Sequence, residues 1–270
     1  MKKIWEVYQM IKKYQVSRLA SSIAFFFIIN GGSLFFLLAL TLNIFNIEFK
    51  DYVLEANQTL KGIILYFEAN ANSYYRPFYF VLILTSLWSS STLFYHIISA
   101  GEFIFEVKRK VIPLLYRVIS LFFVFIFIAL LIIAFIVAVF TSYLLIHLES
   151  FYLRLLLRVI LYLIIPFFVI TFFMLFVPPM RFRMKEVSKG LIFSLAAFLL
   201  ITIGFRIYLV IFERYKAIYG AFTFIIIAMI YIYLLIIVLL LGLLINMLEN
   251  RKIKEKKLEK LEVVKKWKRY

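Results

Sequence analysis

Few residues in the chain belong to the types that perform metal or nucleophilic chemistry. The sequence has no cysteine, only two histidines, His96 and His147, and a single aspartate, Asp51. Metal-dependent hydrolases need several histidine and carboxylate ligands at short spacings, and nucleotide phosphates need glycine-rich loops. Neither pattern occurs in the sequence. The sequence therefore predicts no metal site, no cofactor and no enzymatic activity.

Four polar residues inside long apolar segments are the candidates for substrate binding: Asn30, Ser90, His96 and Arg206. A buried cation such as Arg206 attracts phosphate or carboxylate groups, but its side chain could equally reach outward to water. His96 follows Thr92 by four residues, which places both on one helical face. For His96 we favour a hydrogen bond to a neighbouring helix over a proton relay.

Small residues and one proline predict how the helices pack. Asn30 is followed by Gly31 and Gly32, which could loosen a helix near a substrate or, as we favour, allow close helix packing. Pro166 lies inside the predicted span 155–177, and we expect a kink in the helix there. Gly242 and Asn246 are four residues apart, so they lie on one helical face and could contact a partner helix. The predicted packing residues are Gly31, Gly32, Pro166, Gly220, Gly242 and Asn246.

The elements that carry these residues are six apolar segments. The chain is 65% hydrophobic, well above the roughly half that is typical of soluble domains. About 20 apolar residues suffice for a helix to cross a bilayer. The sequence therefore predicts an all-α, polytopic membrane protein with six transmembrane helices. The predicted spans are residues 19–45, 78–101, 118–146, 155–177, 190–212 and 220–248.

The basic residues predict the orientation of these spans. The formal net charge of +17 would favour nucleic-acid binding if it lay on one soluble surface. Instead, residues 1–18 carry five Lys and Arg, 102–117 four, 178–189 four and 249–270 ten, together 23 of the 31. Lys and Arg collect on the cytoplasmic side of membrane proteins. We therefore expect both termini in the cytoplasm and no nucleic-acid partner.

The domain organisation follows from the same pattern. We expect a cytoplasmic N-terminal segment at residues 1–18, a membrane domain at 19–248 and a basic cytoplasmic tail at 249–270. Apolar residues at helical spacing predict an outer amphipathic helix near residues 51–70. The same spacing in the tail favours a basic helix at the anionic inner leaflet, with a solvated charged tail as the alternative.

Several local motifs occur in one order along nearly the whole chain. They are Arg18-Leu19-Ala20-Ser21-Ser22-Ile23-Ala24-Phe25-Phe26, Trp88-Ser89-Ser90-Ser91, Lys108-Arg109-Lys110, Pro178-Pro179 with Arg181, Gly204-Phe205 with Tyr208, Phe212 and Tyr215, Tyr219-Gly220, and Gly242 with Asn246. Together these motifs resemble the YihY/BrkB family of bacterial inner-membrane proteins. The chain departs from the family pattern in three places: Asn30-Gly31-Gly32-Ser33 stands where Ser-Leu-Phe-Pro is common, Leu244 where an acid is common and Thr202 where a base is frequent.

The resemblance implies a six-helix protein of the bacterial inner membrane, but it implies no single activity. Members of the family carry ribonuclease, serum-resistance and transporter labels. A metal nuclease needs converging carboxylates and histidines, which the chain lacks. The sequence favours a transporter or lipid-handling protein for an amphipathic or anionic substrate, with membrane lipids as partners. The alternative is a structural or partner-binding subunit of an envelope complex, and a lipid-modifying enzyme ranks third.

Overall fold

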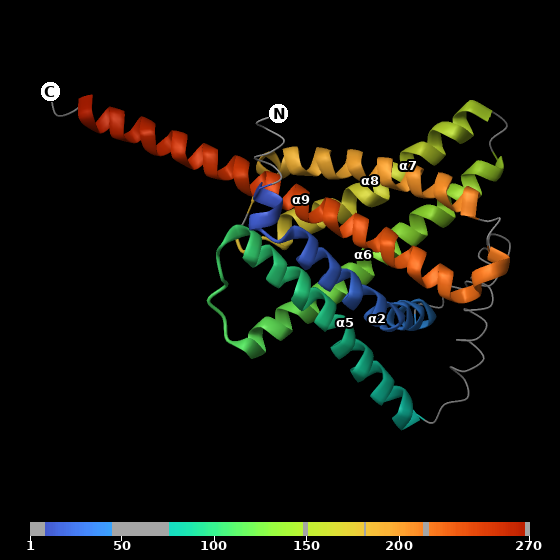
Figure 1. Ribbon diagram of the computed structural model, residues 1–270. Coiled ribbons are helices and arrows are strands. Elements are labelled where there is room, and N and C mark those ends of the chain that lie inside the picture. Colours follow the sequence, from blue (N-terminus) through green and yellow to red (C-terminus); the bar gives the residue numbers. More distant parts are fainter. Residues whose placement is uncertain (1–8, 45–75, 148–150, 181, 213–215, 268–270) are drawn as a thin grey trace. The chain divides into compact units, whose positions relative to one another are not determined.

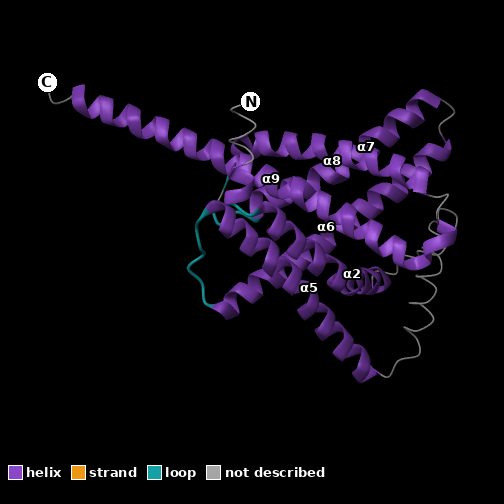
Figure 2. Cartoon of the chain, in the orientation of Figure 1, coloured by secondary structure: helices purple, strands orange, loops and turns teal. Residues whose placement is uncertain are grey.

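The computed structural model of the chain describes residues 9–44, 76–147, 151–180, 182–212 and 216–267. These residues are almost all helical, and no strand occurs among them (Figures 1 and 2). In chain order the helices are α2 (Val16–Ile44), α5 (Arg76–Phe105), α6 (Pro113–His147), α7 (Phe151–Phe176), α8 (Met184–Phe212) and α9 (Lys216–Trp267). Each of the six predicted apolar segments therefore lies almost entirely within one helix. The predicted outer helix near residues 51–70 lies outside the described residues.

Five of these helices contain a stretch that is long and apolar enough to cross a membrane. The stretches are Val16–Leu38, Phe80–Phe105, Pro113–Ala134, Met184–Leu209 and Ile226–Arg251. In α7 the described apolar stretch, Leu163–Phe176, is shorter than a bilayer requires. Helix α7 as a whole is longer than this stretch, because it runs from Phe151 through Pro166 to Phe176. The structure thus describes five candidate spans and a shorter apolar helix where the sequence predicts six spans.

The last predicted span and the basic tail form one helix. Helix α9 continues without a break past the end of its apolar stretch at Arg251 and ends at Trp267. Lys and Glu dominate this continuation, and both residue types favour helices. The predicted boundary between membrane domain and tail at residues 248 and 249 is therefore not an element boundary.

The chain divides into two compact units. Unit 1 comprises residues 1–25, 97–110 and 166–270, and unit 2 comprises residues 26–96 and 111–165. Helices α8 and α9 pack against each other within unit 1. In unit 2 the core includes Phe94 of α5, whose ring contacts Phe123 and Phe127 of α6 with centroids 6.2 and 5.4 Å away.

Two non-glycine residues in the left-handed region separate helices in unit 1. Gln15 has φ 47° and precedes α2, and Glu106 has φ 54° and follows α5. At the end of α5, Glu106 N–H donates to Phe103 O and Val107 N–H donates to Glu102 O, both at 3.2 Å. These bonds satisfy carbonyls that the helix end leaves free, a motif that usually employs glycine. The glutamate at this position therefore points to a role for its side chain.

Candidate functional site

Polar residues of α2 and α5 meet inside unit 2. Asn30 is only 4% exposed, and its Nδ2 donates to Phe26 O at 2.9 Å. Ser89 Oγ donates to Asn30 Oδ1. A buried amide usually has its hydrogen bonds satisfied in this way. The interaction joins two helices that are far apart in sequence, so Asn30 holds α2 against α5.

Ser90 differs from its neighbours in having an unpaired hydroxyl. The Ser91 hydroxyl donates to Trp88 O at 2.7 Å within its own helix. Ser90 Oγ is fully buried and has no hydrogen-bond partner among the described residues. Leaving a buried hydroxyl unpaired costs about 1 to 3 kcal/mol. The described residues therefore leave one buried hydroxyl of unit 2 without a hydrogen-bond partner.

His96 contacts aromatic rings. Its ring stacks on Phe26 of α2 with centroids 3.8 Å apart and an interplanar angle of 14°. Tyr95 approaches it edge-on at 5.6 Å. No hydrogen bond from His96 occurs within the described part of the chain, so stacking takes the place of the hydrogen bond that the sequence favours. A proton relay has no described partner at this residue.

Arg117 of α6 lies between two aromatic rings of α5. Its guanidinium carbon is 5.0 Å from the ring centroid of Trp88 and 5.0 Å from that of Tyr95. Arg117 Nη1 donates to Thr92 Oγ1 at 3.1 Å. In the described residues of both units no carboxylate lies within ion-pair distance of Arg117. Aromatic rings and a hydroxyl hold the cation, which has no described counter-ion.

Arg206 lies in unit 1, whereas the other three predicted substrate-binding residues lie in unit 2. It is exposed on α8 near the end of the apolar stretch at Leu209. Its neighbour on the helix, Phe205, stacks on Tyr231 of α9 at 4.4 Å. Arg206 makes no hydrogen bond or ion pair with a described residue. The outward position agrees with a side chain that reaches toward water or headgroups.

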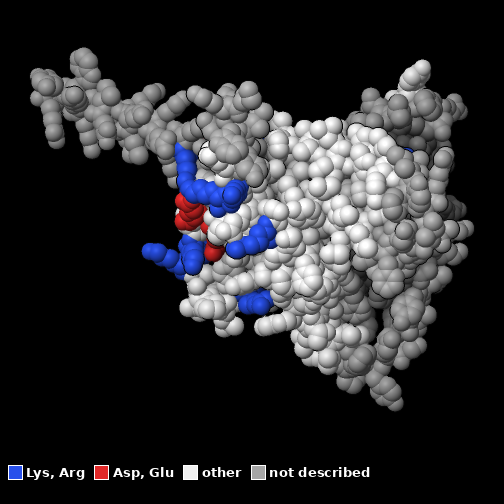
Figure 3. Space-filling view, in the orientation of Figure 1, with Lys and Arg blue, Asp and Glu red and all other residues white. Residues whose placement is uncertain are grey.

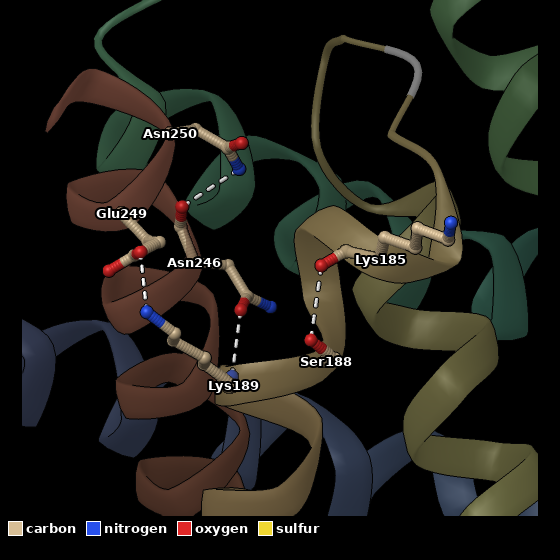
Figure 4. A network of polar contacts seen from close by, with 7 residues as sticks. Lys185, Ser188, Lys189, Asn246, Glu249 and Asn250 are labelled. Atoms are coloured by element: carbon tan, nitrogen blue, oxygen red, sulfur yellow. Dashed lines mark hydrogen bonds and ion pairs between the residues drawn. The ribbon is translucent and has the colours of Figure 1, made fainter. Parts of the chain in front are cut away.

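Helices α8 and α9 approach each other through two glycines. A Cβ added at Gly190 would overlap Gly242 O, and one added at Gly242 would overlap Ser194 Oγ. Asn246 Oδ1 accepts a hydrogen bond from Gly190 N–H at 2.8 Å (Figure 4). Ser194 Oγ donates to Val238 O at 3.1 Å. Small residues with interhelical hydrogen bonds are typical of membrane helix packing. Gly242 and Asn246 thus form part of the α8–α9 contact.

The other predicted packing residues have less close surroundings. A Cβ added at Gly31 or Gly32 would meet nothing within 4 Å, so the close packing that we favoured there is not formed by the described residues. Pro166 lies inside α7. Gly220 belongs to α9, and its surroundings lie outside the described residues.

A cluster of charged residues in unit 1 centres on Glu106, and we call Lys13, Tyr14, Glu106 and Arg251 the Glu106 cluster. Arg251 Nη2 donates to Glu106 Oε2 at 2.8 Å, and Tyr14 Oη donates to Oε1 at 3.0 Å. Lys13 Nζ lies 3.5 Å from Oε1. The hydrogen bond from Arg251, and then that from Tyr14, lower the pKa of Glu106 below its ordinary value of 4.5. The cluster ties the N-terminal segment and α9 to the end of α5.

A cavity of about 440 Å³ lies beside the Glu106 cluster. Acidic and basic side chains gather together on the face that Figure 3 shows. Two carboxylates and two amines among the lining residues leave the cavity without a dominant charge. The lining residues are Lys13, Tyr14, Ser99, Glu102, Phe103, Glu106, Val107 and Lys108.

Arg109 supports the end of α7 in unit 1. Its Nη2 donates to three successive carbonyls, those of Phe176, Val177 and Pro178, at 3.0 to 3.2 Å. A cation at a helix C-terminus is favoured by the helix dipole and by free carbonyls. A Cβ added at Gly101 would overlap Val177, which shows how closely α5 approaches the residue that follows α7. Arg109 therefore has a structural role.

Arg117 was not predicted as a site residue because, in the sequence, it is one of the four basic residues of the connector 102–117. A signal was present: Trp88, Thr92 and Tyr95 are four and three residues apart, so they share one face of α5. Two aromatic side chains flanking a hydroxyl on one face are suited to holding a guanidinium. Among the described residues, no group of His, Asp and Glu side chains could hold a metal ion.

The five apolar helices define a multi-pass helical membrane protein. The family model for Virulence factor BrkB matches residues 7–265, nearly the whole chain. The chain therefore belongs to this family, which confirms the resemblance found in the sequence. No significant match occurs among curated proteins or solved structures.

Proposed function

We propose that the protein moves or handles an amphipathic, anionic substrate, with a phospholipid as the leading candidate, in the bacterial inner membrane. The observation that carries this proposal is that two polar groups of unit 2 lack the partners that such groups usually have. Ser90 offers a buried hydroxyl without a described partner, and Arg117 offers a cation without a described counter-ion. Polar groups in membrane spans are costly, and they persist mainly where they bind substrates, ions or one another.

The apolar setting of these groups favours an amphipathic substrate over a fully soluble one. Both lie in helices with candidate membrane spans, Phe80–Phe105 and Pro113–Ala134. Trp88, beside Arg117, is 62% exposed on its span. A ligand that reaches Arg117 past the exposed Trp88 must tolerate hydrocarbon, and phospholipids combine an anionic phosphate with apolar chains. The sequence contains no nucleotide-binding motif, so any active transport would use a gradient or a partner.

Lipid translocation by purified protein tests this function. The protein is reconstituted into vesicles with a fluorescent phosphatidylglycerol, and the fraction of label accessible from outside is followed with a membrane-impermeant reductant. We expect more than half of the label to become accessible, against half in protein-free vesicles. Ser90→Ala should slow the change, and Ser120→Ala should not.

Ser120 is the matched control because it is also fully buried in unit 2, but its hydroxyl donates to Tyr116 O of its own helix at 3.0 Å. Accessibility that stays at half for the wild-type protein would count against lipid translocation. Equal rates for both serine variants would remove Ser90 from the substrate path.

A second candidate function is that of a partner-binding subunit in an envelope complex. The continuation of α9 to Trp267 as one helix favours it, because this basic helix extends beyond the apolar stretch. Deletion of residues 252–270 should then abolish co-purification of an envelope protein while the membrane domain stays folded. Unchanged recovery of partners would count against the tail as a docking surface.

A further inference from the structure

The guanidinium of Arg117 is held firmly but is only partly used. It carries five N–H donors, and the described residues accept a hydrogen bond from Nη1 alone, through Thr92 at 3.1 Å. Thr92 Oγ1 itself donates to Trp88 O at 3.1 Å. This second bond fixes the hydroxyl so that its lone pairs face the guanidinium. The other N–H groups of Arg117 are therefore held in a fixed orientation, and they make no hydrogen bond to a described residue.

Two aromatic rings replace the carboxylate that usually accompanies an arginine in a membrane span. Trp88 and Tyr95 both lie 5.0 Å from the guanidinium carbon, within the range of cation–π attraction. Tyr95 is in turn fixed by Tyr116, whose ring meets it at 62° and 5.0 Å. These contacts stabilise the cation without neutralising it, so the site retains its positive charge.

We infer that Arg117, Trp88, Thr92 and Tyr95 form a binding site for the phosphate of an anionic phospholipid. A guanidinium offers paired donors that match the oxygens of a phosphate, and the resulting hydrogen bonds are charge-assisted. Phosphate supplies the counter-ion that the described residues do not. We call these four residues the Arg117 site. The inference rests on the proposed function only in treating this lipid as the substrate.

The surroundings select a lipid phosphate over a soluble one. Leu84 and Trp88 are exposed on α5, and Thr92 and Tyr95 continue the same face at spacings of four and three. Helix α6, which contacts α5, also exposes apolar side chains at helical spacing: Val118, Phe122 and Phe125. Exposed apolar rows on membrane spans face hydrocarbon and can lie along acyl chains. Arg117 itself is four residues, about 6 Å, from the start of its span at Pro113.

Tryptophan fluorescence tests the site directly because Trp88 is part of it. Trp5→Phe and Trp267→Phe remove the other two tryptophans. The protein is reconstituted in phosphatidylcholine bilayers containing either brominated phosphatidylglycerol or brominated phosphatidylcholine at equal mole fraction. Bromine quenches only tryptophans in contact with the labelled lipid. We expect phosphatidylglycerol to be preferred at Trp88 on the order of tenfold, as expected for a charge-assisted pair.

Three variants establish which group causes the preference. Arg117→Gln should make quenching by the two lipids equal, and Arg117→Lys should keep part of the preference because it keeps the charge but loses the planar donors. Arg183→Gln is the matched control: Arg183 is an exposed arginine without a described side-chain partner, and its loss should leave the preference unchanged. Circular dichroism and thermal unfolding of each variant verify that it is folded.

Each remaining outcome decides the inference. Equal quenching by both lipids in the wild-type background would overturn it. Loss of the preference when inorganic phosphate is added would assign the site to free phosphate instead of lipid and would also overturn it. A preference for phosphatidylglycerol without lipid translocation would support the site while contradicting the proposed function, and translocation without the preference would do the reverse.

Discussion

The polar groups in the α8–α9 contact of unit 1 and those on the α5–α6 face of unit 2 are treated differently by the fold. In unit 1, Asn246 bonds to Gly190 N–H, and Ser194 bonds to Val238 O. In unit 2, Ser90 has no described partner, and Arg117 has no described counter-ion. Satisfied polar groups between membrane helices fix their packing, whereas unsatisfied ones are available to a ligand. The difference marks the α8–α9 contact as structural and the α5–α6 face of unit 2 as the candidate for recognition.

The largest effect is expected from filling the space between the two glycines of unit 1. Gly190→Ala places a methyl group against the backbone oxygen of Gly242, which cannot move cheaply. We expect the free energy of unfolding to fall by about 1 to 3 kcal/mol, measured by thermal or denaturant unfolding in detergent. Gly204→Ala, on the same helix with nothing within 4 Å, is the control and should be neutral or stabilising. Similar losses in both variants would show that α8 and α9 do not depend on this contact.

A smaller effect is expected from removing the interhelical hydrogen bond of Asn246. Asn246→Leu keeps the volume of the side chain but leaves Gly190 N–H without its 2.8 Å acceptor. The free energy of unfolding should fall by about 0.6 to 2 kcal/mol. In Asn250→Leu the lost bond runs only to Asn246 O of the same helix, so this control should lose less. An Asn246→Leu protein as stable as the wild type would contradict the structural role of the amide.

The same substitution, Ser→Ala, at one fully buried position in each unit compares the two units. Ser194 and Ser90 are both fully buried, but only Ser194 donates a described hydrogen bond. Ser194→Ala should lower the free energy of unfolding by about 0.6 kcal/mol, whereas Ser90→Ala should leave it unchanged or raise it, since an unpaired hydroxyl is removed. Unfolding curves measured side by side provide the comparison. A larger loss for Ser90→Ala would indicate a structural partner for its hydroxyl.

The smallest effect concerns the pH dependence of the Glu106 cluster. Because its partners lower the pKa of Glu106 below 4.5, the ionised carboxylate contributes stability above that pH. This contribution is lost as the pH falls through the lowered pKa of the folded protein. Glu106 is almost half exposed, so the contribution is at most about 1 kcal/mol. Between pH 7 and pH 3, the Tm of the wild type should fall more steeply with pH than the Tm of Glu106→Gln. If the two Tm curves run parallel, the cluster does not contribute to acid sensitivity.

Apolar segment length was enough to predict the helices, because continuous apolar runs in a membrane protein have few alternatives to a helix. Charge placed the start of the basic tail at residue 249 without predicting a break in the helix, and α9 continues through this position to Trp267. Charge sets orientation, whereas helix propensity sets where a helix ends. Asn246 was recognisable as an interhelical residue because a single amide stands near the end of an apolar run.

The candidate site was harder to predict, because partnership is a property of three-dimensional packing. Arg206 was a candidate because it lies within a predicted span, with an outward side chain as the open alternative, and the structure places it exposed in unit 1. It passed over Arg117, whose importance depends on Trp88 and Tyr95 of another helix. Asn30 was selected for its polarity, and only the structure identifies its partners as Phe26 O and Ser89 Oγ.

We propose that the guanidinium of Arg117, which has no described counter-ion, recognises the lipid that the protein moves. This proposal is tested by the ratio of translocation rates for fluorescent phosphatidylglycerol and phosphatidylcholine in vesicles containing wild-type, Arg117→Gln or Arg183→Gln protein of equal thermal stability. We expect a ratio well above one for the wild type and Arg183→Gln, and a ratio near one for Arg117→Gln. A ratio that is the same in Arg117→Gln as in the wild type would show that Arg117 does not select the lipid.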